Sequence, residues 1–217
     1  MENKNEFQPV IILSIVSILL SVFSIAADAI VQKINNGYND AFIVLFVSAI
    51  ALGVLYLASS TTRKQKMLDA INLVTNIVLI VFGSVVAIIE YSNFVQDNNL
   101  GIIYGLRFAI GLVVMVAAIL KLIYFFISRN SESIRKIYST ITLLTIICIS
   151  VYLAMFFVHE AIISYGENKV PSIHLFLFVG SILVFTILSY VSPRSNIEEK
   201  KEKNTEEIEV INQEEKK

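Results

Sequence analysis

Long apolar stretches and short polar segments alternate along the chain. Six stretches are near or above the roughly 20 residues that an apolar helix needs to cross a bilayer. They cover residues 10–31, 41–59, 70–90, 102–127, 137–158 and 173–191. The segments between them are short and rich in Asn, Asp and Gly, which favour turns. The pattern predicts an all-α membrane protein, a bundle of six transmembrane helices.

The first stretch carries hydroxyl side chains at regular steps and then an acid. Ser14, Ser17, Ser21, Ser24 and Asp28 follow one another at steps of three or four residues, which places all five on one face of a helix. Lipid offers these groups no hydrogen-bond partner. We therefore expect this face to turn toward other helices or toward a hydrated cavity.

The third stretch has a polar face of its own, on which Asn72 and Asn76 precede Glu90. Amides inside a membrane form hydrogen bonds between helices that contribute about 0.6 kcal/mol on average. We expect Asn72 and Asn76, like the serines of the first stretch, to be helix-packing residues. The fourth stretch begins with Gly101 and Gly105, a GxxxG spacing that predicts close approach of a neighbouring helix or a second protomer.

Basic residues mark alternate segments between the stretches and so predict the orientation in the membrane. Cytoplasmic segments are enriched in Lys and Arg. The clusters after the second, fourth and sixth stretches are Arg63, Lys64 and Lys66; Arg129, Arg135 and Lys136; and Arg194, Lys200 and Lys201. The other segments between stretches contain two basic residues, Lys33 and Lys169. We therefore expect both termini to be cytoplasmic.

The fourth stretch contains two cations, Arg107 and Lys121, and still fits a spanning helix. Their separation of fourteen residues corresponds to about 21 Å along a helix. In a hydrocarbon core of about 30 Å, both can lie a few ångströms inside opposite boundaries. We expect their long side chains to snorkel outward to the two interfaces.

Composition agrees with a membrane protein and gives no support for nucleic-acid binding. Of the residues, 56% are apolar and 16% are charged, against about 45–50% and about 25% in soluble domains. The net charge of −1 provides no basic surface for nucleic acid. The single cysteine, Cys148, allows neither an intramolecular disulfide nor a zinc site. Frequent Ile, Asn and Lys are typical of an AT-rich genome, so we expect a bacterial plasma membrane.

Charged and imidazole side chains gather near the expected outer boundary of the bundle. Each residue adds about 1.5 Å along a helix. By this measure, the acids and the histidine near the ends of the first, third and fifth stretches lie at the level where the fourth and sixth stretches begin. The expected site comprises Asp28, Glu90, Arg107, His159, Glu160 and His174. It could hold a cation or, through Arg107, an anionic substrate. The alternative is that each residue only marks a helix end, because charged side chains avoid hydrocarbon.

The sequence offers no catalytic constellation. His159 and Glu160 begin like the zinc protease motif HExxH, but the second histidine would have to stand where the chain has Ile163. There is also no phosphate-binding glycine loop, no nucleophile with its base and no lipidation motif. We therefore expect no metal, no cofactor and no enzymatic activity.

The two ends of the chain differ from the apolar part. Residues 194–217 are mostly Glu, Lys, Asn and Gln, which predicts a charged, disordered cytoplasmic tail beside a transmembrane domain over residues 1–193. Ser24 and Ala26 would suit the cleavage site of a signal peptide. However, the leader before the first stretch has two acids and one lysine, where a signal peptide is positive. An uncleaved first helix is therefore favoured.

These patterns are compatible with two classes of function. The first is a small transport or substrate-binding membrane subunit that uses the outward-facing polar site. The second is a non-catalytic structural or interaction protein that packs beside other membrane components and offers its tail to cytosolic partners. In either case the expected partners are the lipid bilayer and other membrane subunits or a second copy of the chain, and not nucleic acid.

Overall fold

The computed structural model describes residues 7–35, 41–62, 64–96, 101–127, 132–167 and 172–192. These residues form six helices: α1 (Gln8–Asn35), α2 (Ala41–Thr61), α3 (Gln65–Gln96), α4 (Gly101–Ile127), α5 (Glu132–Glu167) and α6 (Ile173–Val191). All six are long and apolar enough to cross a membrane, which confirms the predicted number and type of elements. The charged tail, residues 194–217, lies outside the described residues.

Three helices are at least six residues longer than the apolar stretches that predicted them. Helix α1 continues to Asn35, α3 begins at Gln65 and ends at Gln96, and α5 covers Glu132–Glu167. Hydropathy reports only the part of a helix that suits hydrocarbon. The backbone hydrogen bonds of a helix continue into polar sequence wherever no proline or turn signal stops them. As a result, the acids that the sequence places at helix ends lie inside their helices.

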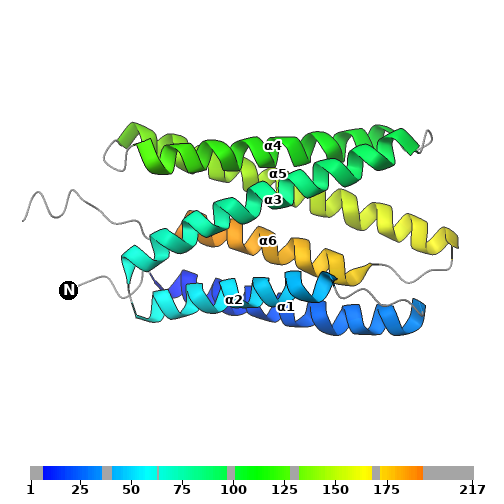
Figure 1. Ribbon diagram of the computed structural model, residues 1–217, viewed down its shortest axis with the longest axis horizontal. Helices are drawn as coiled ribbons and strands as arrows, with labels where there is room; N and C mark the ends of the chain where they lie inside the picture. The colour runs from blue at the N-terminus through cyan, green and yellow to red at the C-terminus, as the bar shows by residue number, and fades with distance from the viewer. Residues whose placement is uncertain are drawn as a thin grey trace, which may run out of the picture.

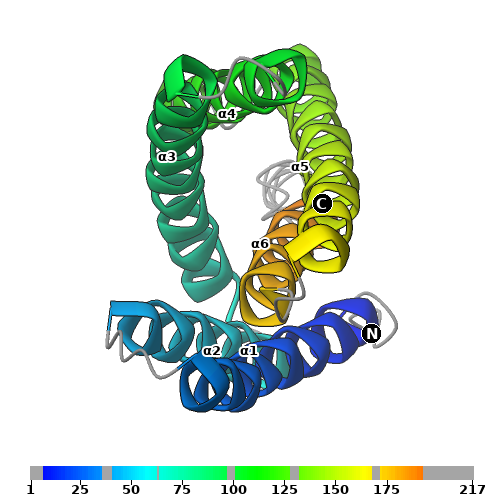
Figure 2. The same cartoon turned by 90° about the vertical axis from the view of Figure 1, so that its right-hand side faces the viewer.

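The helices form a ring in chain order. Each helix packs against the next one along the chain, and α6 returns to α1, so that the ring closes. Helix α3 is tilted: it starts beside α2 and ends beside α4, where the most extensive packing of the bundle occurs (Figures 1 and 2). Helix α5 is tilted in the opposite sense and leads from α4 to α6 (Figures 1 and 2). Helix α6 also contacts α2 and α3 across the ring.

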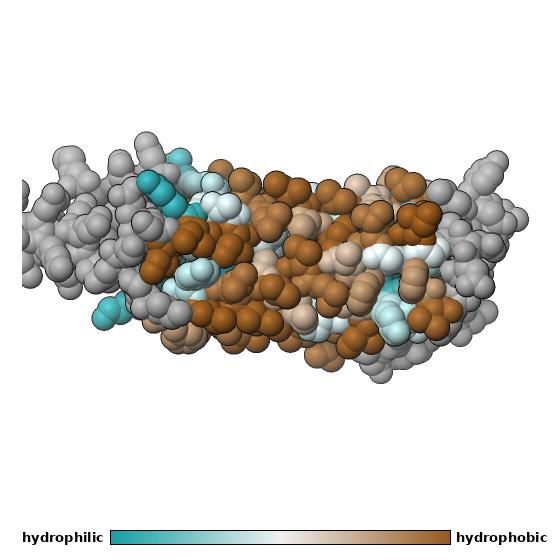
Figure 3. Space-filling view, turned by 90° about the horizontal axis from the view of Figure 1, so that it is seen from above, coloured by the Kyte–Doolittle hydropathy of each residue, from teal (hydrophilic) through white to brown (hydrophobic). Residues whose placement is uncertain are grey.

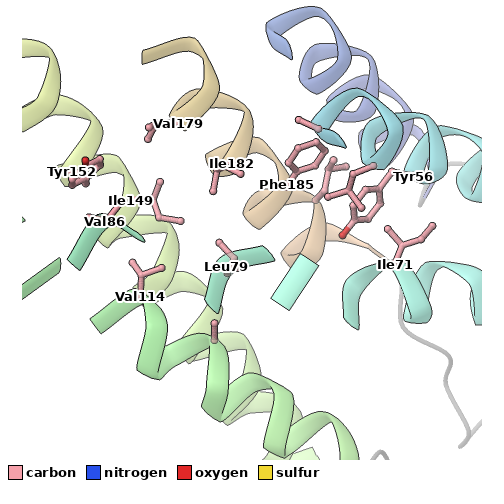
Figure 4. Close-up of a cluster of buried hydrophobic side chains, with 14 of the residues drawn as sticks. Tyr56, Ile71, Leu79, Val86, Val114, Ile149, Tyr152, Val179, Ile182 and Phe185 are labelled. Atoms are coloured by element: carbon pink, nitrogen blue, oxygen red, sulfur yellow. The ribbon is translucent and has the colours of Figure 1, made fainter. Parts of the chain in front are cut away.

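The core lies where the tilted helices face α6. Leu79 of α3, Ile149 of α5 and Ile182 of α6 are almost completely buried and point toward one another (Figure 4). Toward α2, the rings of Tyr56 and Phe185 stack with their centroids 6.3 Å apart. Apolar side chains from all six helices belong to this cluster, so it joins the ring into a single body.

The crossing of α3 and α4 brings two backbones into direct contact. A Cβ atom on Gly83 would lie 2.7 Å from the backbone nitrogen of Met115 and 2.8 Å from the carbonyl oxygen of Gly111. A Cβ on Gly111 would likewise lie 2.8 Å from the backbone nitrogen of Ala87. Only glycine permits this approach. By contrast, Gly101 and Gly105 of the GxxxG pair face the ring of Phe94 at ordinary contact distance.

The outer surface between the two ends of the bundle is apolar. Figure 3 shows brown, hydrophobic side chains covering the middle of the visible face, with polar residues mostly toward its ends. Large apolar side chains such as Ile88, Ile102 and Phe126 are at least 70% exposed. Soluble monomers rarely expose continuous apolar areas of this kind. The surface is compatible with a multi-pass membrane protein whose helices face lipid.

Candidate functional site at the polar end of the bundle

One end of the bundle collects the acids, histidines and arginine that the sequence singles out. It is the end at which α1, α3 and α5 finish and α2, α4 and α6 begin, and it faces the viewer in Figure 2. We call it the polar end. Helix α1 continues for seven residues beyond Asp28, α3 for six beyond Glu90 and α5 for seven beyond Glu160. These residues therefore lie one and a half to two turns inside their helices and do not mark helix ends.

An ion pair between α3 and α4 forms the centre of this end. Nη2 of Arg107 lies 2.6 Å from Oε1 of Glu90, and the two side chains are only 4% and 1% exposed. The hydroxyl of Tyr152, on α5, donates a second hydrogen bond to the same oxygen at 3.1 Å. Three helices thus meet at one carboxylate oxygen. Arg107 turns into the bundle, whereas the sequence predicts that it snorkels outward.

Aromatic rings surround the guanidinium. The Cζ atom of Arg107 lies 5.3 Å from the ring centroids of Tyr152 and Phe156, and 6.0 Å from that of Tyr104. A cation within about 6 Å of an aromatic face is attracted by the electron density of the ring, most strongly where water is excluded. We call these three side chains the aromatic cage. They stabilise the positive charge independently of Glu90.

Several polar atoms of the ion pair remain without a hydrogen-bond partner. They are Oε2 of Glu90 and Nε and Nη1 of Arg107, and all three are buried. A buried polar atom without a hydrogen bond typically costs about 1–3 kcal/mol. The faces of the aromatic cage compensate the two nitrogens in part, since an N–H group can point at a ring. The side chain of Asn93 lies near the Glu90 carboxylate.

A second polar group at this end joins α1, α5 and α6. Nε2 of His174 lies 3.8 Å from Oδ1 of Asp28, and both side chains are less than 10% exposed. Oε2 of Glu160 accepts a hydrogen bond from the backbone N–H of Ser172 at 3.1 Å. This carboxylate therefore caps the first turn of α6, where the helix dipole favours a negative charge.

The two groups are connected through α5. His159 and Glu160 are neighbours in the sequence, so they project about 100° apart from the helix axis. Nε2 of His159 lies 3.1 Å from the hydroxyl of Tyr104, which belongs to the aromatic cage. Glu160 faces the group around His174. All six residues that the sequence assigns to this site are thus near one end, in two adjoining clusters.

Deeper polar side chains bond within the bundle. Ser14, Ser17, Ser21 and Ser24 are buried, and each hydroxyl donates to a backbone carbonyl one turn earlier in α1. The face packs on neighbouring helices: a Cβ on Gly53 of α2 would lie 2.9 Å from the hydroxyl oxygen of Ser17. The serines therefore satisfy their own hydrogen bonds while keeping the side chains small at a close helix contact.

The two asparagines of α3 bond across the bundle. Oδ1 of Asn72 accepts a hydrogen bond from the hydroxyl of Tyr56 on α2 at 2.8 Å. Nδ2 of Asn76 donates to the hydroxyl of Tyr138 on α5 at 3.2 Å. These contacts hold α3 to its neighbours at the end away from the polar end.

Lys121 of α4 lies near that opposite end and is completely buried. Its ammonium group donates to the hydroxyl of Ser189 at 3.3 Å and lies 5.2 Å from the ring centroid of Tyr138. The side chain does not snorkel to the interface, contrary to the sequence expectation. For both cations of α4, polar and aromatic groups on neighbouring helices replace the water that an outward conformation would provide.

The aromatic cage is the part of the site that the sequence analysis missed. Tyr152, Phe156 and His159 follow one another at steps of four and three residues, which puts them on one face of α5. That spacing, together with the position of Tyr152 far from either expected membrane boundary, is the available signal. What it could not show is that Arg107 of another helix turns toward this face.

The polar end brings acidic and basic side chains together. Three carboxylates, of Asp28, Glu90 and Glu160, stand against one guanidinium and two imidazoles. Within the described helices, no group of three or more His, Cys, Asp or Glu side chains is placed to hold a metal ion. Carboxylates, imidazoles and a guanidinium are side chains of the kind that bind protons and small charged species in other membrane proteins.

Comparison with known proteins gives no further guide, because the chain matches no family model, no curated protein and no solved structure. The six described helices are potential membrane spans by their length and composition. At the polar end, the feature that bears on function is the buried ion pair of Glu90 and Arg107 with its incomplete hydrogen bonding.

Proposed function

We propose that this protein is a small transport or substrate-binding subunit of the plasma membrane, with both termini in the cytoplasm and the polar end outward. The distribution of basic residues supports this orientation. Lys64 and Lys66 lie where α2 ends and α3 begins, at the end opposite the polar end. Lysine and arginine are favoured on the cytoplasmic side of membrane proteins.

The observation that carries the proposal is the incomplete hydrogen bonding of the Glu90 and Arg107 pair. A charged pair inside a membrane protein is expensive to desolvate, and replacing it with apolar side chains is often neutral or stabilising. Here the geometry is not optimised for stability either, because one oxygen and two nitrogens are buried without hydrogen bonds. Ionisable residues of this kind within spanning helices are typically functional.

The serines of α1 and Asn72 of α3 behave differently from this pair. The serines of α1 bond to their own helix, and Asn72 bonds to Tyr56. These groups are explained by helix packing alone. Among the polar groups discussed, the Glu90 and Arg107 pair has the most buried atoms without a hydrogen bond, three, whereas Asn76 has one, its Oδ1.

The hydrogen-bonded polar contacts of α1, α2 and α3 favour a second candidate function. A protein whose interior is closed by hydrogen bonds can serve as a rigid membrane partner, with no passage for solutes. In that role it would scaffold other membrane components, and its charged tail would contact cytosolic partners. The ion pair at the polar end would then only fix α3 to α4.

Charge movement on reconstituted protein distinguishes the two functions. Proteoliposomes immobilised on a solid-supported membrane would be perfused in turn with sodium, potassium, glycine and glutamate at constant ionic strength. A transport or binding subunit should give a transient current with at least one of these probes, and Glu90→Gln and Arg107→Leu should abolish it. Asp69→Asn, at the other end of α3, is the matched control and should keep the current. A current that persists in correctly folded Glu90→Gln protein would contradict the assignment of the site.

A further inference from the structure

The free oxygen of Glu90 restricts which ligand this carboxylate can take. Oε1 already accepts hydrogen bonds from Arg107 and Tyr152, whereas Oε2 is closed to solvent and makes no such bond, with the side chain of Asn93 near the carboxylate. A solute or a water molecule needs space beside the atom that it binds. A proton needs none, because it occupies a lone pair of the oxygen itself. In this conformation, a proton is the ligand that Oε2 can hold without any movement of helices.

Protonation of a carboxylate beside an arginine normally leaves an isolated buried cation, which is strongly unfavourable. The aromatic cage changes this balance for Arg107. Tyr104, Tyr152 and Phe156 lie within 6.0 Å of its guanidinium carbon and attract the positive charge whether or not Glu90 is ionised. Arg107 can therefore remain charged and buried in both protonation states of its partner.

We propose that Glu90 is an exchangeable proton-binding site, and this inference deepens the transport function proposed above by naming its coupling ion. Hydronium at the polar end supplies the proton when local motion opens Oε2 to water, so that the carboxylate becomes a carboxylic acid and water is released. Arg107 keeps its charge in the aromatic cage. The net charge of the pair rises from zero to plus one, and the electrostatic link between α3 and α4 weakens.

The titratable groups around Glu90 are few, which makes its response separable. Arg107 and Tyr104 face it from α4, and Tyr152 faces it from α5, with His159 beyond Tyr104. Helix α2 contains no charged residue or histidine. The single titratable side chain of α6 apart from Tyr190 is His174, which lies beside Asp28 of α1.

Infrared difference spectroscopy measures the proposed proton directly. Purified protein in lipid would be brought from neutral to mildly acidic pH, and the carbonyl stretch of newly protonated carboxyl groups would be recorded. We expect a band in the wild type and in Asp69→Asn, and loss of part of that band in Glu90→Gln. Protonation of Asp28 or Glu160 would remain in all three spectra. A Glu90→Gln spectrum identical to that of the wild type would overturn the proposal.

A variant of the aromatic cage tests the same proposal without touching the ion pair. Phe156→Leu removes one of the three rings and leaves an apolar side chain in its place. Because the ring stabilises Arg107 most when Glu90 is protonated, its loss should make proton binding weaker. The midpoint of the infrared band should move to lower pH, by about one pH unit for one desolvated cation–π contact. A midpoint that stays unchanged or rises in Phe156→Leu would contradict the role of the aromatic cage.

The two proposals fail independently. A band that depends on Glu90 in a protein that moves no charge with any probe would support the proton site and contradict transport. Currents with the probes, together with a Glu90→Gln infrared spectrum identical to that of the wild type, would support transport and contradict the proton site. If Glu90→Gln does not fold, as judged by circular dichroism and gel filtration, the midpoint of Phe156→Leu decides the proton site.

Discussion

A methyl group at position 83 would separate the two helices that pack most closely. Its carbon would lie 2.7 Å from the backbone nitrogen of Met115 and 2.8 Å from the carbonyl oxygen of Gly111. Non-bonded heavy atoms settle at about 3.5–4.0 Å, so the two backbones would have to move apart by nearly 1 Å. Both obstructing atoms belong to the backbone of α4 and cannot rotate away, as the end of a side chain could.

The magnitude of the effect follows from two opposed contributions. Overpacking a well-packed contact costs about 1–3 kcal/mol. Alanine inside a helix is favoured over glycine by roughly 0.5–1 kcal/mol. We therefore expect Gly83→Ala to lower the free energy of unfolding by about 1–2 kcal/mol.

Gly101→Ala is the matched control, because the nearest atom to its new methyl group would be a ring carbon of Phe94 at 3.7 Å. That is an ordinary contact, and we expect Gly101→Ala to be as stable as the wild type or slightly more stable. The assay is unfolding of purified protein by increasing SDS in mixed micelles, followed by circular dichroism. A Gly83→Ala protein as stable as Gly101→Ala would refute the backbone crossing.

Three further predictions concern the buried polar groups. Arg107→Leu should lose about 3–5 kcal/mol of stability, because it leaves Glu90 buried without its counter-charge, and adding Glu90→Gln should restore most of the loss in a double-mutant cycle. Tyr56→Phe should cost about 0.6–1.7 kcal/mol through loss of its hydroxyl contacts to α3, with the stacked ring retained, as SDS unfolding would show. Ser14→Ala and Ser21→Ala should change stability by less than about 0.5 kcal/mol and leave probe currents intact, because each hydroxyl bonds only within its own helix. A large loss in either serine variant would contradict a packing role.

The number of helices could be predicted from the sequence because hydrocarbon imposes a minimum apolar length. The helix ends could not be predicted in this way, because α3 and α5 continue through polar residues such as Gln65 and Glu167, which lie outside the apolar stretches. The same applies to Glu90. Counting residues from the start of the apolar stretch gives its approximate level, but the apolar stretch ends there, whereas the helix continues for six more residues.

The sequence does not determine which neighbouring helix each side chain of the site faces, and this limited the prediction of the site. Spacing along α4 fixes the levels of Arg107 and Lys121, but it does not say which neighbouring helix each one faces. The partner of Arg107 on α3 and its aromatic cage on α4 and α5 depend on how three tilted helices meet. The GxxxG pair shows the same limit, because the closest backbone approach uses Gly83 and the isolated Gly111.

Thiol labelling on intact cells tests most directly whether the polar end faces outward. In a Cys148→Ser background, Asn93→Cys places a thiol on α3 one turn beyond Glu90, and Lys64→Cys places one at the exposed opposite end. With a membrane-impermeant maleimide, we expect Asn93→Cys to be labelled on intact cells and Lys64→Cys only after the cells are permeabilised. Labelling of Lys64→Cys on intact cells, with Asn93→Cys protected until permeabilisation, would contradict the proposed outward-facing site.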